Sequence, residues 1–155
     1  AASGSVDQEL LEGLIADSYF SKSGPKSTGT EYFNIDWLEN TYSKVTTLAA
    51  EDVQATLAEL TAYRIALSVL REGYDKSEIF ICGGGVHNHY LVDRIRHHLP
   101  AAMVQSTAAL GLDPDYVEAT AFGWLAKCAI DKLPGNLPTV TGARHPAILG
   151  AIYPT

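Results

Sequence analysis

The chain has 155 residues, of which 46% are hydrophobic and 19% charged, and its net charge is -7. This length and composition are typical of one soluble globular domain, or of one lobe of a larger protein. Eleven Lys and Arg residues are spread thinly, so the chain lacks the clustered cationic surface that binds nucleic acid or anionic membranes. No apolar run approaches the roughly 20 residues that span a bilayer.

The first residues have neither the basic nor the apolar region of a signal peptide, and no initiator Met precedes them. We therefore expect a cytoplasmic protein, of which this chain is a fragment. Cys82 and Cys128 lie far apart inside apolar runs and lack the spacing of a zinc site. They are predicted to be buried thiols in a reducing compartment.

The amino-terminal part is predicted to hold two short helices separated by a loop. Ser5 has capping-box spacing to the residue three positions later, at the start of a helix over residues 5–16. The breaker-rich stretch Ser21–Thr30 must be a loop. Asn34 can cap a second helix that continues to Tyr42. The apolar side of this second helix consists of Ile35, Trp37 and Leu38.

The longest periodic segment is Glu51–Arg71, which the spacing predicts to be one amphipathic helix. Large apolar residues recur in it at intervals of three and four, and we expect them to face the core. These residues are Val53, Leu57, Leu60, Tyr63, Leu67 and Leu70.

Two strands and a helix are predicted to follow. Ile79–Cys82 is a short, continuous apolar run, typical of a strand buried on both faces of a parallel sheet. A helix from about Asn88 to His98 follows, and Ala102–Ser106 is the second strand. We expect the inward residues of this helix to be Leu91, Ile95 and Leu99.

A last long helix is predicted to begin at Asp113-Pro114 and to end near Ile130. It is apolar nearly all round, which predicts that it is buried. The order helix, strand, helix, strand, helix indicates the α/β class, with a mixed or parallel sheet flanked by helices.

The feature most suggestive of chemistry is the run Gly83–Gly85, directly after the first predicted strand. Three glycines permit unusual backbone conformations and allow a flat ligand or a phosphate to approach the main chain. The run matches neither the P-loop nor the spaced G-x-G-x-x-G pattern. A tight strand-to-helix turn remains an equal alternative, and Asn88 has a plain alternative as a helix N-cap.

Two further groups of side chains have functional and structural interpretations. His87, His89, His97 and His98 lack the paired spacing of metal ligands, so we predict no metal site. Glu118 lies near the start of the apolar helix, where with Asp115 it can offset the helix dipole. Alternatively, Glu118 faces a cleft, where it could bind sugar hydroxyls or orient a water.

Six stretches carry a resemblance to a known family. They are Pro25–Gly29 with Glu31 and Phe33–Asn34, Glu51–Leu57, Gly83–Asn88, Asp115–Phe122, Leu133–Ala143 and Leu149–Pro154. Together they resemble the anhydro-N-acetylmuramic acid kinases, bacterial sugar kinases of the actin/Hsp70/hexokinase superfamily. The stretch Leu133–Ala143 is the most specific, whereas the glycine run is shared across the superfamily.

The resemblance implies one lobe of an actin-like ATPase (ribonuclease H-like) fold. Residues 1–155 would be the carboxy-terminal, adenosine-binding lobe, with residues 1–50 as a helical and loop segment packed on it. The cofactors would be ATP and Mg²⁺, and the partner would be the amino-terminal lobe of the same polypeptide. Gly83, Gly84, Gly85 and Asn88 match the adenosine-side motif, and Glu118 matches a family carboxylate near the sugar.

The family reaction opens 1,6-anhydro-N-acetylmuramic acid with water and phosphorylates the freed 6-oxygen, within peptidoglycan recycling. The chain departs from the family pattern because it lacks the phosphate-binding loop G-T-S-x-D-G. It also lacks the segment D-T-G-P-G-N, whose Asp would be the catalytic base, so we expect this chain alone to be inactive. The alternatives are a lobe of another sugar kinase and a non-catalytic nucleotide-binding module. A homodimer is left open.

Overall fold

The computed structural model describes residues 1–23 and 26–153 as a mixed helical and sheet protein. Two parallel strands pair directly, with Glu78 opposite Met103 and Ile81 opposite Ser106. The predicted α/β class with a parallel sheet is therefore confirmed at this level. The elements are α1 (Gln8–Ile15), α2 (Ser18–Ser21), α3 (Ile35–Thr41), α4 (Ala50–Arg71), β1 (Glu78–Ile81), α5 (His89–His98), β2 (Met103–Ser106), α6 (Val117–Ile130) and α7 (Pro138–Thr141), with short 3₁₀ turns η1 (Val45–Thr47), η2 (Gly84–His87), η3 (Thr107–Leu110) and η4 (Pro114–Tyr116).

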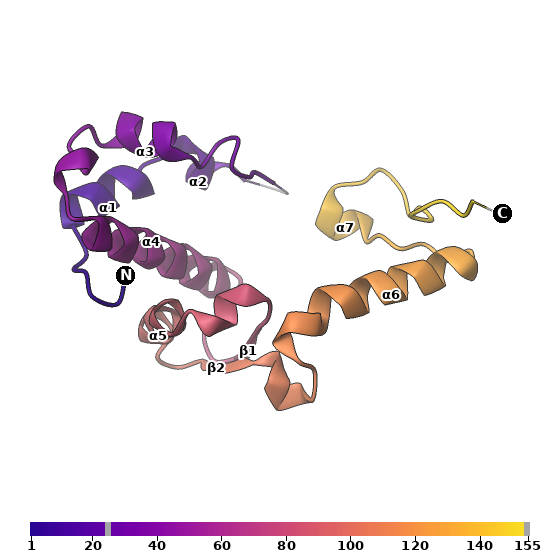
Figure 1. The fold of residues 1–155 in the computed structure, drawn as a ribbon. Helices are drawn as coiled ribbons and strands as arrows, with labels where there is room; N and C mark the ends of the chain where they lie inside the picture. Colours follow the sequence, from indigo (N-terminus) through magenta and orange to yellow (C-terminus); the bar gives the residue numbers. More distant parts are fainter. Residues whose placement is uncertain (24–25, 154–155) are drawn as a thin grey trace.

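Helices α1 and α3 pack on the first half of α4, as Figure 1 shows in indigo and purple. The predicted cap of α1 was wrong, because Asp7 and not Ser5 is the N-cap: its carboxylate accepts from the Leu10 N–H at 2.8 Å. The Ser5 N–H instead donates to Asp52 Oδ1 at 2.7 Å, and this bond attaches the chain start to α4. The buried apolar residues of this first core are Leu10, Leu11, Leu14, Leu38, Val45 and Leu60.

The predicted second helix is confirmed as α3, with Asn34 as its N-cap; Asn34 Oδ1 accepts from the Trp37 N–H at 2.9 Å. Leu38 is buried as expected, but Ile35, the first residue of α3, is exposed. Most of the predicted loop Ser21–Thr30 has no helix or strand where it is described, although Ser21 ends α2. Residues 24 and 25 lie outside the described residues.

A second core lies between α4, α5 and the sheet. The predicted helix Glu51–Arg71 is confirmed as α4, and Leu60 is buried as expected. The predicted face is only partly right, because Leu70 is exposed while Ala62 and Ala66 are buried. Small residues bring the two helix backbones close together, so the contact with α5 selects a face that the large residues alone do not mark. The predicted inward residues Ile95 and Leu99 of the α5 segment are buried.

Glu59 joins α4 to α5 through two basic side chains. Its side chain is almost fully buried, and its carboxylate accepts from Arg94 at 2.5 and 2.9 Å and lies 2.8 Å from His98 Nε2. Hydrogen bonding from Arg94 outweighs the effect of burial and lowers the pKa of Glu59, with a smaller contribution from His98. A group with a lowered pKa in the folded state stabilises the fold above its unfolded pKa.

We expect Glu59→Gln to lower the free energy of unfolding by roughly 1–2 kcal/mol near neutral pH, because a hydrogen bond to a charged group is lost inside the protein. The difference from wild type should shrink as the pH falls through the folded pKa of Glu59, since wild type then loses the same charge. Thermal unfolding across this pH range measures it, with the exposed Glu39→Gln as control. An equal deficit at every pH would contradict the ion-pair explanation.

Strand β1 is less buried than the sequence predicted. Its residues are at most half-buried, so a strand covered on both faces is not what the chain forms by itself. Cys82, expected to be buried, is exposed, whereas Cys128 is buried as predicted. The difference arises because Cys82 follows the last paired residue of β1, where the chain leaves the sheet.

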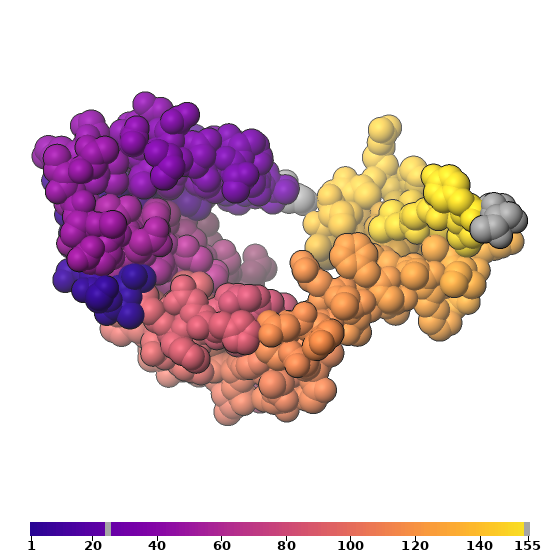
Figure 2. Space-filling model, in the orientation of Figure 1, coloured from indigo at the N-terminus to yellow at the C-terminus, as the bar shows by residue number. Residues whose placement is uncertain are grey.

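Helix α6 projects from the sheet, and the carboxy-terminal segment with α7 folds back along it (Figure 1). The prediction that this helix is buried was wrong: Phe122 is 69% and Trp124 56% exposed, and Cys128 is its one buried residue. The carboxy-terminal segment covers one side of α6, and the described residues supply no cover for the rest. Figure 2 shows a wide hollow between this region and the amino-terminal helices. No described helix is both long and apolar enough to cross a membrane.

Candidate functional site

The glycine turn, Gly83–Gly85, follows β1 and enters the 3₁₀ turn η2. Gly83 has φ 71°, a conformation that residues with a side chain rarely adopt, so glycine is required there by the backbone. Gly84 and Gly85 have no such φ, and a Cβ at either position would meet no atom within 4 Å. The packing of the described chain therefore gives no reason for glycine at these two positions, and the backbone is open to an approaching ligand.

Asn88 ends the turn and begins α5. Its Oδ1 accepts from the Leu91 N–H at 3.1 Å, which makes it the N-cap of that helix. The structural interpretation of Asn88 is thus what the geometry shows. A second role, in which the same side chain contacts a nucleotide, stays a prediction.

The glycine turn is attached to the start of α6. The Gly83 N–H donates to the Pro114 carbonyl at 2.8 Å. His87 Nε2 lies 2.9 and 3.0 Å from the two carboxylate oxygens of Asp115. Sequence reasoning missed this pair, because 28 residues separate its members and Asp115 has a sufficient local explanation at a helix start.

Glu118 lies in the first turn of α6, as predicted, and its side chain is exposed. Within the described part of the chain it forms no hydrogen bond or ion pair, so its carboxylate is free to meet a ligand. The contacts of Gly83 and Asp115 with their partners hold the glycine turn next to the segment that carries Glu118. The structure therefore brings both predicted site segments to one end of the sheet.

The histidines occupy separate surroundings. His97 and His98 lie in the last turn of α5, where positive charge is favourable, and His98 contacts Glu59. In residues 1–23 and 26–153, no group of three His, Cys, Asp or Glu side chains is placed to hold a metal ion. Mg²⁺ takes one or two carboxylates plus phosphate oxygens in kinase sites, and the structure assigns none of its ligands among the residues that it describes.

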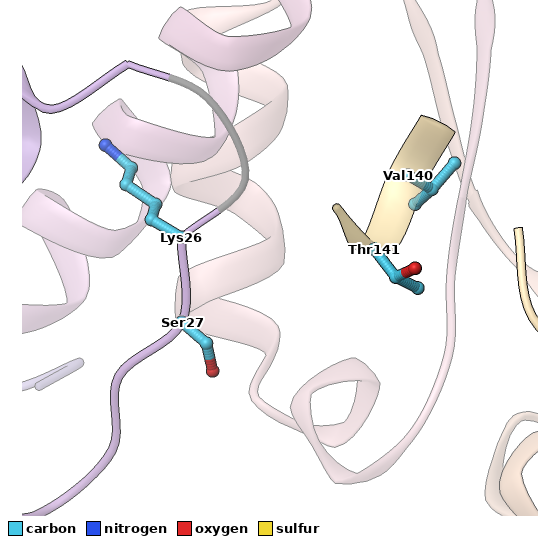
Figure 3. Close-up of a pocket in the computed structure, with 4 residues that line it drawn as sticks. All are labelled: Lys26, Ser27, Val140 and Thr141. Carbon is cyan, nitrogen blue, oxygen red and sulfur yellow. The ribbon is translucent and has the colours of Figure 1, made fainter. Parts of the chain in front are cut away.

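A different cavity, of about 280 Å³, lies between the amino-terminal loop and α7. Figure 3 shows its lining: Lys26 and Ser27 on one side, and Val140 and Thr141 on the other. The Lys26 ammonium donates to the backbone carbonyls of Tyr19 and Lys22, at 3.1 and 3.0 Å. This cavity is therefore lined by residues of two of the stretches that carry the family resemblance, Pro25–Gly29 and Leu133–Ala143, which are far apart in the sequence. It is separate from the glycine turn.

The first residues of the stretch Leu133–Ala143 hold the carboxy-terminal segment against α6. A Cβ on Gly135 would lie 2.9 Å from Leu125 Cδ2, so any larger residue would require this leucine side chain to shift where the chain passes α6. Asn136 donates to the His145 carbonyl at 3.1 Å and accepts from the Ala147 N–H at 2.6 Å. These contacts fold the carboxy-terminal segment back onto the helix.

Comparison with known proteins agrees with the resemblance seen in the sequence. The family model described as "Anhydro-N-acetylmuramic acid kinase" matches residues 1–155. Curated proteins with that name are 51% identical in Pseudomonas syringae pv. tomato, 50% in Xanthomonas axonopodis pv. citri and 45% in Hahella chejuensis, each over 154 residues. The alignments cover 99% of this chain but 42%, 41% and 41% of these relatives.

Proposed function

Because the chain belongs to the anhydro-N-acetylmuramic acid kinase family, we propose that it is the carboxy-terminal, adenosine-binding lobe of an ATP-dependent sugar kinase. The finer fold assignment, an actin-like ATPase of the ribonuclease H-like type, is part of this proposal. It is supported by the order α4, β1, glycine turn, α5, β2 and α6 around a parallel sheet. Residues 1–50 are assigned to the same lobe, on which α1 and α3 pack through the first core.

One observation carries the nucleotide assignment: neither the backbone conformation nor the packing of the described chain requires glycine at positions 84 and 85. Neither has a left-handed φ, and a Cβ would meet open space at both. Glycine in an ordinary conformation costs conformational entropy, so its presence is explained by something that must approach the backbone closely. In this proposal the adenosine part of ATP lies against Gly83–Gly85, with Asn88 at its edge.

The whole polypeptide is proposed to open the anhydro bridge of 1,6-anhydro-N-acetylmuramic acid and to phosphorylate the freed 6-oxygen. ATP supplies the phosphoryl group when bound. The residues of this chain bind and orient: the glycine turn holds the nucleotide, and Glu118 orients the sugar or the attacking water. Such positioning is a large part of catalysis in phosphoryl transfer, which needs little covalent chemistry from the protein.

The exposed surface of α6 supports the proposal that this chain packs against the amino-terminal lobe of the same polypeptide. An apolar groove of about 640 Å³ lies between α6 and the carboxy-terminal segment. Large contiguous apolar surfaces mark interaction sites, and the chain spans about 42% of the length of the curated relatives it matches. The groove is lined by Phe122, Leu125, Ala126, Ala129, Ile130, Leu149, Gly150, Ala151 and Ile152.

We expect the 155-residue chain alone to show no turnover with Mg-ATP and the anhydro sugar, whereas the full-length polypeptide that carries it turns over. The reason is that the chain lacks both the triphosphate-cradling loop and the Asp of the family pattern. Chromatographic detection of the phosphorylated sugar measures both samples side by side. Turnover by the isolated chain that survives repeated purification would contradict the assignment of this chain as one lobe. Nucleotide binding without turnover by the full-length polypeptide would instead favour a non-catalytic binding module.

A further inference from the structure

The joint between the glycine turn and the start of α6 contains a hydrogen-bonded contact between the His87 imidazole and the Asp115 carboxylate. It connects η2 with η4, two short segments between which α5 and β2 intervene in the sequence. His87 and Asp115 form the one side-chain hydrogen-bonded link between these segments in the described chain. The Gly83 N–H to Pro114 carbonyl bond is its backbone counterpart.

Both members of the pair are held by their own segments. The Asp115 N–H donates to Asp113 Oδ1 at 3.0 Å, so the turn that presents the carboxylate is fixed. On the other side, the Asn88 N–H donates to the Gly85 carbonyl at 3.1 Å, which closes the 3₁₀ turn that presents His87. The imidazole therefore meets both carboxylate oxygens without a further rearrangement of either backbone.

A contribution to the stability of the fold does not explain the contact between His87 and Asp115. The side chains of His87 and Asp115 are 62% and 54% exposed, and exposed ion pairs contribute little to the free energy of folding. A run of three glycines, by contrast, does not fix its own conformation, because glycine loses more freedom on ordering than any other residue. A ligand that binds such a turn gains affinity when the turn is ordered beforehand.

We propose that His87 and Asp115 are positioning residues for the nucleotide: the pair orders the glycine turn against the start of α6 before ATP binds. The inference rests on the proposed nucleotide role of the turn. Among the described residues, neither side chain forms a hydrogen bond with Gly83–Gly85 or with Glu118, so the effect of the pair is on the shape of the site. Loss of the pair should raise the ATP KM, since the glycine turn must then become ordered when ATP binds, and this ordering reduces the free energy of binding.

The test is made in the full-length polypeptide with four variants: His87→Ala, Asp115→Ala, the double variant and Asp115→Asn. We expect each alanine variant to raise the ATP KM about two- to fivefold, the range that the free energy of an exposed pair allows, with kcat, the sugar KM and the Tm close to wild type. The double variant should be no worse than either single variant, because both remove one contact. Asp115→Asn keeps an acceptor oxygen for the imidazole and should restore most of the ATP affinity.

Asp131→Ala is the matched control, since it removes another exposed ion pair, with Lys127, at the far end of α6. An unchanged ATP KM in folded Asp115→Ala and His87→Ala, or an equal rise in Asp131→Ala, would overturn the positioning role. Additive effects of the two alanine variants would do the same. If the wild-type polypeptide binds no ATP at all, the proposed function fails, and that outcome is distinct from a wild-type enzyme whose variants are unaffected.

Discussion

Glu118→Gln is expected to lower kcat/KM for the anhydro sugar by about 10²–10⁴-fold in the full-length polypeptide, the usual loss when acid–base help is removed. Glu118 is exposed in the first turn of α6. Its carboxylate forms no hydrogen bond or ion pair with the described residues, so the charge is available to a ligand. The contacts of the neighbouring Asp115 and Pro114 hold this turn beside the glycine turn, where the proposed function places the sugar and the nucleotide.

The competing explanation for Glu118 is simple compensation of the helix dipole. It predicts a small drop in Tm and normal kinetics, so kcat/KM and Tm of the same variant separate the two. Asp36→Asn is the control, because Asp36 is also an exposed acid in the first turn of a helix, α3. Normal sugar kinetics in Glu118→Gln, with a Tm change like that of Asp36→Asn, would leave Glu118 as a helix-end acid.

The sequence predicts best where short-range chemistry decides. Asn34 was predicted to be an N-cap, and an N-cap was one of the two interpretations of Asn88, because the side chain, the turn and the first N–H groups of the helix are neighbours in sequence. The cap of α1 shows the limit of such reasoning. Ser5 and Asp7 are both good caps, and bonds to α4, 47 and 49 residues away, decide between them.

Which face of a helix is buried depends on the elements that pack against it. The periodicity of α4 marks its large residues, but the contact with α5 is made by Ala62 and Ala66, whose small side chains carry little weight in a hydrophobic pattern. Helix α6 shows the opposite case. Its pattern is typical of a helix with neighbours on all sides, whereas the described residues cover it on one side.

The glycine turn and Glu118 were recognisable in the sequence because unusual residue types stand at element boundaries. Their proximity was not, since it depends on the parallel pairing of β1 with β2 and on the His87–Asp115 contact across 28 residues. Periodicity and capping rules carry no information about such a contact. The exposure of Cys82 was missed because the predicted strand included it, whereas β1 ends one residue earlier, at Ile81.

Gly84→Val is expected to raise the ATP KM of the full-length polypeptide by roughly 5- to 150-fold. A Cβ at Gly84 meets open space, and its φ is not in the left-handed region, so the chain itself accepts the change. A ligand lying against the backbone does not, because added methyl groups in a close contact cost about 1–3 kcal/mol, and about 1.4 kcal/mol is tenfold in affinity. Gly84→Ala, with a single methyl group, should give an intermediate value.

The ATP KM of Gly84→Val, measured beside its Tm and the sugar KM, tests the assignment of this lobe most directly. The assignment predicts a raised ATP KM, graded from glycine through alanine to valine, with the Tm and the sugar KM little changed. A folded Gly84→Val variant with the wild-type ATP KM would contradict it, and would leave Gly83–Gly85 as a plain strand-to-helix turn.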